Sequence, residues 1–250
     1  MNFLQQVKVR AKAEIKTIVL PESYEKRTLK AANAALAEGI AKIILIGDRE
    51  SIQNEAGGLD LSAASFVDPK SYSGMDELTE KLYEMRKAKG LTREEAEKLL
   101  RENPLYLSVM LVKEGVADGM VSGAIHSTAD ALRPSLQILK TAPGVKLVSA
   151  FFVIVVPNCE YGEDGVFIFA DSGMVQNPNP EELAAIAESS AKSFAQLVGK
   201  APVVAMLSHS TKGSAKHADV DKVVEATRIL KQNAPNLAAD GEFQLDAAIV

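Results

Sequence analysis

The chain has 250 residues, of which 47% are apolar and 24% charged, as in ordinary folded proteins of one large or two smaller domains. A formal net charge of -5, without a dense Lys/Arg run, argues against nucleic acid or an anionic membrane as the main partner. One cysteine excludes an intramolecular disulfide, no signal-peptide pattern is present, and the longest apolar run is too short to span a bilayer. We therefore expect a cytoplasmic protein.

The first half of the chain alternates between strand-like and helix-like patterns. Apolar runs that end at Pro, Gly or Asp predict strands over 17–20, 41–46 and 64–67. Helical periodicity, with a Thr-x-x-Glu capping box at Thr92, predicts helices over 24–38, 76–88, 92–101 and 104–114. Strands separated by helices indicate βαβ units, and hence a mainly parallel sheet with helices on both faces.

Beyond Lys140 the pattern changes. The turn-rich segment 141–144 predicts a boundary between two α/β domains, 1–143 and 144–250. Apolar strands over 147–156 and 166–170 follow at the spacing of a hairpin. A helix, a strand and a second helix are then expected over 180–198, 202–207 and 215–233.

The segment DGMVSGAIHSTADALRPSLQ, residues 118–137, is a candidate anion site. A short strand over 116–121 leads into a helix with hydroxyls at Ser127 and Thr128. Free backbone N–H groups and the positive end of the helix dipole favour an anion there, and Arg133 can lean back toward it. The alternative is an ordinary helix without a ligand. In that case Ser127 is only the helix cap, the helix ends or kinks at Pro134, and Arg133 is a solvated charge.

Part of this segment, SGAIHSTADALRP, is similar to the signature of the phosphate acetyltransferase (phosphotransacetylase) family among the phosphate acetyl/butyryltransferases. Four further blocks resemble that family in its order: YEMRKAKGLT at 83–92, FADSGMVQNPNPEELAAIA at 169–187, LSHSTKGSAKHADVDKVVEAT at 207–227 and DGEFQLDAAIV at 240–250. The resemblance implies two α/β domains with mainly parallel sheets and an interdomain cleft, like the isocitrate/isopropylmalate dehydrogenase fold, and usually a homodimer.

The resemblance also implies an activity, the reversible transfer of an acetyl group between coenzyme A and inorganic phosphate to give acetyl phosphate. It implies direct attack of the coenzyme A thiolate on the acyl phosphate, with coenzyme A as a substrate, no tightly bound cofactor and no metal. The general base of the family lies in a region that has no match here. Since residues 244–250 are apolar and end without a polar tail, we expect the chain to be truncated.

Site residues follow from the resemblance. Arg133 is expected to be catalytic and to contact both phosphate and coenzyme A. The other expected residues are Ser127 and Thr128 for phosphate, Arg86 for coenzyme A, and Ser122, Gly123, His126, Ser210, Lys212 and Gly213 for the cleft wall. From the residues alone, Arg86 would belong to a solvated basic face of a helix. The loop 208–214 lacks the spacing of a P-loop, but it follows a strand, at the end of the sheet where ligands bind.

Other reactive residues have weaker patterns. Asp171 is a possible base or metal ligand, but it more simply orders a turn after a strand. His126, His209 and His217 lack the spacing of a metal site, and no local base activates Cys159.

Three alternatives stay open. A metal- and nicotinamide-dependent dehydrogenase also binds substrate anions with a Ser-to-Arg helix, although neither a metal nor a nicotinamide pattern is found. Phosphate butyryltransferase shares the anion motif and differs in acyl pocket. A non-catalytic domain that binds coenzyme A or acyl phosphate would fit if these residues are the whole protein.

Overall fold

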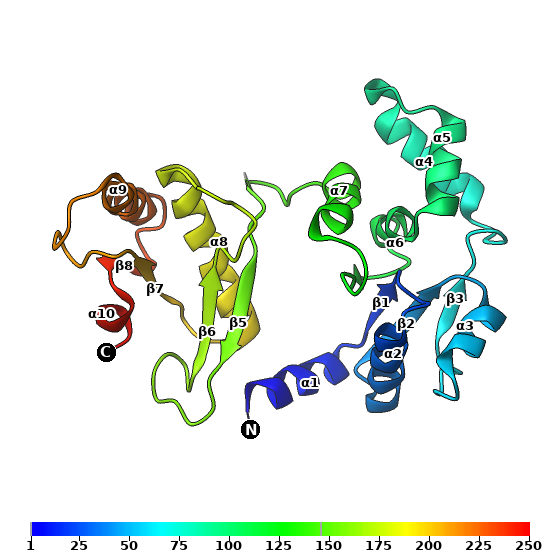
Figure 1. Cartoon of the computed structure of the whole chain (residues 1–250), viewed down its shortest axis with the longest axis horizontal. Helices are drawn as coiled ribbons and strands as arrows, with labels where there is room; N and C mark the ends of the chain where they lie inside the picture. Colours follow the sequence, from blue (N-terminus) through cyan, green and yellow to red (C-terminus); the bar gives the residue numbers. More distant parts are fainter. Residues whose placement is uncertain (1, 146) are drawn as a thin grey trace. The chain divides into compact units, whose positions relative to one another are not determined.

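The computed structural model describes residues 2–145 and 147–250, which divide into two compact units (Figure 1). One unit is Leu4–Lys140, and the other is Thr141–Val250 together with residues 2 and 3. Both combine strands and helices, which confirms the predicted α/β class. Among the described residues, no helix is long and apolar enough to cross a bilayer.

A single parallel sheet forms the centre of the Leu4–Lys140 unit. Its strands are β1 Lys16–Leu20, β2 Ala41–Ile46, β3 Ser65–Val67 and β4 Gly119–Met120, in the order β3-β2-β1-β4. All three pairings are parallel, so the carboxyl ends of the strands lie along one edge. The chain adds β2 and β3 on one side of β1 and β4 on the other. The strand order therefore reverses between β1 and β4, the place where open α/β sheets bind ligands.

Helices cover both faces of this sheet, as predicted. The helices of this unit are α1 Phe3–Ala13, α2 Lys26–Glu38, α3 Arg49–Ala56, α4 Met75–Arg86, the 3-10 turn η1 Lys87–Lys89, α5 Arg93–Glu102, α6 Pro104–Lys113 and α7 Thr128–Ile138, of which α1 buries no residue. Alternate residues of β2 point to opposite faces. Ile43 and Leu45 pack in one buried cluster with Leu29 of α2. Ile44 packs in a second cluster with Met110 of α6.

Local differences from the predicted elements have physical causes. β4 is two residues long because it pairs on one side only, with β1, before the chain turns away at Ser122. The helices α1 and α3 were not predicted, since α1 buries no residue and α3 buries two. Pro134 does not close α7. It is buried inside the helix, which continues to Ile138 without the backbone hydrogen bond that a proline cannot donate.

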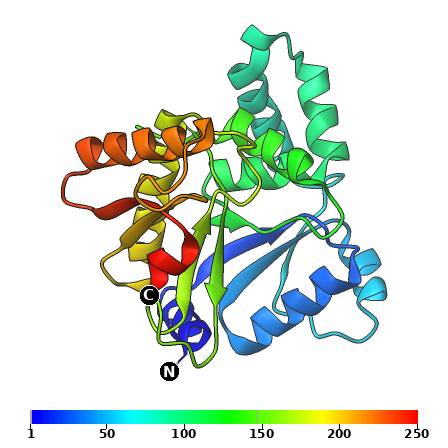
Figure 2. The ribbon, with the colours of Figure 1, turned by 60° about the vertical axis from the view of Figure 1, so that its left-hand side comes forward.

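The second unit has two short sheets. β5 Phe151–Val155 and β6 Val166–Ala170 pair antiparallel, which confirms the predicted hairpin, while β7 Val203–Leu207 and β8 Ala238–Phe243 pair parallel (Figure 2). The helices are α8 Pro180–Val198, α9 Ala218–Asn233 and α10 Leu245–Ile249. The core of this unit consists of two alanines of α8, three apolar residues of α9 and one methionine of β7: Ala184, Ala187, Val223, Ala226, Leu230 and Met206.

The capping box predicted at Thr92 is present. Thr92 accepts the backbone N–H of Glu95 at 3.1 Å, and the Glu95 carboxylate accepts the N–H of Thr92 at 2.9 Å. Thr92→Ala should lower the free energy of unfolding by about 1 kcal/mol in urea titrations, because an orphan N–H of α5 loses its partner. Thr141→Ala, at an exposed position outside any helix, is the control. An equal loss of unfolding free energy in the two variants would contradict a stabilising cap at Thr92.

Candidate functional site

Glu22 forms the centre of the site at the point where the strand order reverses. It lies two residues beyond β1 and accepts backbone N–H groups from the loop that follows β4. One carboxylate oxygen accepts Gly123 N at 3.0 Å and Ala124 N at 2.8 Å. The other accepts Ile125 N and His126 N, both at 2.9 Å, and lies 2.9 Å from Nδ1 of His126. Four consecutive amides thus surround one carboxylate.

These contacts keep Glu22 ionised. Burial opposes the charged form, since 2% of the side chain is exposed. The N–H groups of Ile125, Ala124 and His126 and the His126 ring outweigh this and lower the pKa of Glu22 to about 2. The loop amides therefore neutralise a carboxylate of the protein itself, and they are not available to a bound phosphate.

Arg27 binds the opposite side of the same loop. Its Nη2 donates to the carbonyl oxygen of Ala124 at 2.8 Å, and its Nε donates to Glu25 at 2.7 Å. Glu25 in turn accepts the N–H groups of Arg27 and Thr28 at the start of α2. The loop is therefore held through its N–H groups by Glu22, which precedes α2, and through the C=O of Ala124 by Arg27 in the first turn of α2.

Ser127 caps the helix α7. Its hydroxyl oxygen accepts the N–H of Asp130 at 3.2 Å, and its O–H donates to the Asp130 carboxylate at 2.7 Å. That hydroxyl is the main cause that lowers the pKa of Asp130. The capping role considered for Ser127 is therefore observed, and phosphate binding by this hydroxyl stays a prediction.

Thr128, Ala129 and Arg133 keep free donors. Within the described residues, neither the N–H groups of Thr128 and Ala129 nor the exposed Arg133 guanidinium has a hydrogen-bond partner. Ala129 and Arg133 are four residues apart, so they share a face of α7, about 6 Å apart along the axis. Since helical side chains lean toward the N-terminus, Arg133 and these N–H groups can reach one anion.

Arg86 lines a hollow that α7 also reaches. The hollow has a volume of about 370 Å³ and is bordered by Arg86, Lys89, Tyr106 and Gln137 among others. The hydroxyl of Tyr106 donates to Oε1 of Gln137 at 2.8 Å. Gln137 follows Arg133 by four residues, on the same face of α7. One helix face thus connects the candidate anion site with the basic hollow.

Of the remaining predicted wall residues, Ser210, Lys212 and Gly213 have partners within the protein, and the hydroxyl of Ser122 has none among the described residues. The Oγ of Ser122 is buried and has no partner within the described residues. Ser210 and Gly213 belong to the second unit, where the Ser210 hydroxyl and the Gly213 N–H donate to buried Glu242 at 3.0 and 2.7 Å. Lys212 donates to Asp240 at 2.9 Å. Glu242 therefore orders the loop after β7 much as Glu22 orders the loop after β4.

Asp171 and the other candidate residues have structural partners. Asp171 accepts the N–H groups of Ala150 and Met174 at 3.0 and 2.7 Å, which orders the turn after β6. His217 caps α9 through Nδ1. Cys159 is a free thiol. In the described part of the chain, no group of three or more His, Cys, Asp or Glu side chains could hold a metal ion.

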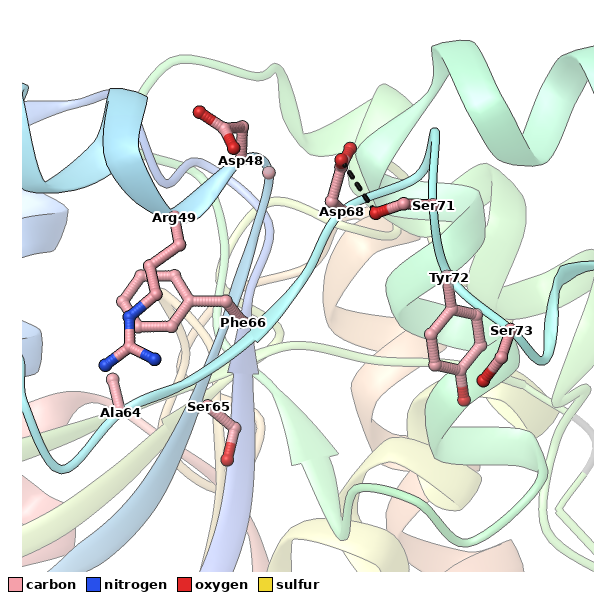
Figure 3. A pocket seen from close by; sticks show the side chains of 10 residues that line it. Asp48, Arg49, Ala64, Ser65, Phe66, Asp68, Ser71, Tyr72 and Ser73 are labelled. Atoms are coloured by element: carbon pink, nitrogen blue, oxygen red, sulfur yellow. Dashed lines mark hydrogen bonds between the residues drawn. The ribbon is translucent and has the colours of Figure 1, made fainter.

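A larger hollow lies at the carboxyl ends of β2 and β3 (Figure 3). Its volume is about 660 Å³, and the Arg49 guanidinium lies 5.1 Å from the centre of the Phe66 ring. Its two carboxylates accept hydrogen bonds from residues close to them in the sequence. Asp48 caps α3, and Asp68 accepts the Ser71 hydroxyl at 3.0 Å. No residue predicted for the site lines this hollow.

The fold and the geometry define an α/β protein with a candidate anion site where its sheet order reverses. The chain belongs to the family described as Phosphate acetyl/butaryl transferase, whose sequence model matches residues 2–250. It is 54% identical, over 100% of its length, to the phosphate acetyltransferases of Acetivibrio thermocellus and Thermoanaerobacterium thermosaccharolyticum, and spans 75% and 76% of those proteins. The structure is similar to that of EutD phosphotransacetylase from Staphylococcus aureus, with a TM-score of 0.88, 41% identity, and coverage of 99% of this chain and 74% of that one.

Glu22 and Arg27 are the site residues that the sequence analysis missed. Both lie in the segment 21–28, which follows β1, includes the first residues of α2 and carries four charged residues. A carboxylate directly after a parallel strand is a signal, because that position lies at the ligand-binding edge of the sheet. Its partners are 101 to 104 positions further along the chain, so no local pattern indicates them.

Proposed function

We propose that this protein is a phosphate acetyltransferase, which transfers an acetyl group reversibly between coenzyme A and inorganic phosphate with acetyl phosphate as the second acyl carrier. The 54% identity to named phosphate acetyltransferases over the whole chain carries this conclusion. The free donors at the start of α7 agree with it, because acetyl phosphate presents a dianionic leaving group.

Arg133 has the central role in this proposal. Its guanidinium and the N–H groups of Thr128 and Ala129 bind the phosphoryl oxygens, and they stabilise the charge that phosphate gains as it leaves. The coenzyme A thiolate attacks the carbonyl carbon directly, the bond between that carbon and the phosphate oxygen breaks, and inorganic phosphate departs. Ser127 and His126 border the phosphoryl group.

Coenzyme A is proposed to bind over the hollow at Arg86, along the α7 face that carries Arg133. The basic side chains of Arg86 and Lys89 suit the phosphates of the coenzyme. A homodimer, a cytoplasmic location, the absence of a bound cofactor, and a cleft wall that includes Ser210, Lys212 and Gly213 stay predictions.

Purified full-length protein should form acetyl-coenzyme A from acetyl phosphate and coenzyme A without added metal or nicotinamide, measured by thioester absorbance. Butyryl phosphate, tested in parallel, should be the poorer substrate. Faster turnover of butyryl phosphate would favour a butyryltransferase. Nicotinamide-dependent oxidation of a hydroxy acid without acetyl transfer would favour the dehydrogenase alternative, and binding of coenzyme A without turnover would favour a non-catalytic domain.

A further inference from the structure

Glu22 fixes the segment that leads directly into the anion-binding end of α7. Its carboxylate accepts four consecutive loop amides and lies 2.9 Å from Nδ1 of His126, the residue before the helix cap. From this geometry we propose that Glu22 is a positioning residue for acetyl transfer, which holds loop 123–126 in place and fixes the tautomer of His126. The inference rests on the proposed function, since it concerns the same site.

The loop held by Glu22 determines where a substrate anion can bind. Successive backbone N–H groups in a turn form a concavity that attracts anions, and a phosphate would compete for it if it were empty. Here Glu22 fills that concavity, with 2% of its side chain exposed. The phosphoryl group is therefore directed to the next free donors in the chain, the N–H groups of Thr128 and Ala129, within reach of Arg133.

The same carboxylate determines which nitrogen of His126 carries the proton. An ionised carboxylate accepts hydrogen bonds only, so the Nδ1 that faces Glu22 must be the protonated nitrogen of a neutral ring. Nε2 is then the acceptor. The His126 side chain is 27% exposed whereas Glu22 is 2% exposed, so the ring is the part of this pair that a ligand can reach.

The kinetic test compares Glu22→Gln with the control Asp118→Asn. Asp118 also accepts a backbone N–H, that of Thr17 at 2.7 Å, but at the amino end of β4. Glu22→Gln places an amide NH₂ against N–H donors, so the loop must shift. We expect the KM for acetyl phosphate to rise about tenfold or more, with a smaller change in the KM for coenzyme A. Asp118→Asn should leave both values within about twofold.

Equal losses in the two variants, or a Glu22→Gln variant with unchanged KM for acetyl phosphate, would overturn the proposal. A lower kcat alone, in proportion to the unfolded fraction, would show that Glu22 serves folding rather than positioning.

Nitrogen-15 NMR of the histidine rings tests the tautomer in the wild-type protein without reference to activity. His126→Asn identifies the signals. The wild-type protein should show His126 protonated at Nδ1 when neutral, and Glu22→Gln should shift the population toward the Nε2–H form. A wild-type ring protonated at Nε2 would refute the proposal. If the wild-type protein lacked acetyl transfer while the Nδ1–H tautomer was present, the proposed function would fail and the positioning of His126 by Glu22 would stand.

Discussion

Replacing Arg133 by alanine is expected to lower kcat/KM for acetyl phosphate by about ten- to a hundredfold. A charge-assisted hydrogen bond left unmade costs roughly 1.5–3 kcal/mol, and this one serves both the bound phosphoryl group and the charge that develops on it. Both kcat and the affinity for acetyl phosphate should therefore fall. The structure makes the variant informative, because Arg133 is exposed and has no ion-pair partner among the described residues.

Arg133→Lys separates charge from geometry. A lysine restores a point charge but not the planar, two-pronged donor of a guanidinium, so we expect a partial recovery of kcat/KM. Arg228→Ala is the matched control. Arg228 is also an exposed arginine on a helix, paired with Glu225 at 2.6 Å, and its removal should leave the kinetics nearly unchanged. Wild-type kinetics in Arg133→Ala would make Arg133 a surface charge and remove the anion site from α7.

The second large effect concerns stability at acid pH. The pKa of Glu22 is lowered from 4.5 to about 2 in the folded protein. A depressed carboxyl pKa stabilises the fold above the unfolded pKa, and this contribution is lost as the pH falls through the folded value. Glu22 should therefore contribute about 3 kcal/mol above pH 5, and lose most of it between about pH 4.5 and pH 2.

Urea unfolding of wild type and Glu22→Gln across this pH range measures that contribution. Other carboxylates titrate in the same window, so the difference between the two proteins isolates Glu22. The difference should shrink as the pH falls, since a protonated glutamate resembles a glutamine. Glu55→Gln, at an exposed position of α3, should instead follow the wild-type curve in parallel. A wild-type minus Glu22→Gln difference that stays constant from pH 5 to pH 2 would contradict the ionised, buried carboxylate.

The sequence by itself determined most of the elements, the α/β class and the family, whereas α1, α3, β8 and α10 were not predicted. The period of apolar residues sets helices and strands locally, which is why α8 has the predicted bounds 180–198 and the capping box of Thr92 is present. The residues proposed to bind the anion could also be identified from segment 118–137 alone, because the cap Ser127 and Arg133 belong to one helix. These features depend on residues within a few positions of one another.

Only the tertiary structure decided which distant groups meet at the site. Glu22 binds amides 101 to 104 positions away because β1 and β4 are neighbours in the sheet, a pairing that the local pattern of neither strand specifies. Gln137 meets Arg86 at one hollow because α4, α6 and α7 pack on the same face. The ionised state of Glu22 and the proposed tautomer of His126 depend on these long-range contacts. A buried carboxylate takes its partners from whatever the strand order brings near it.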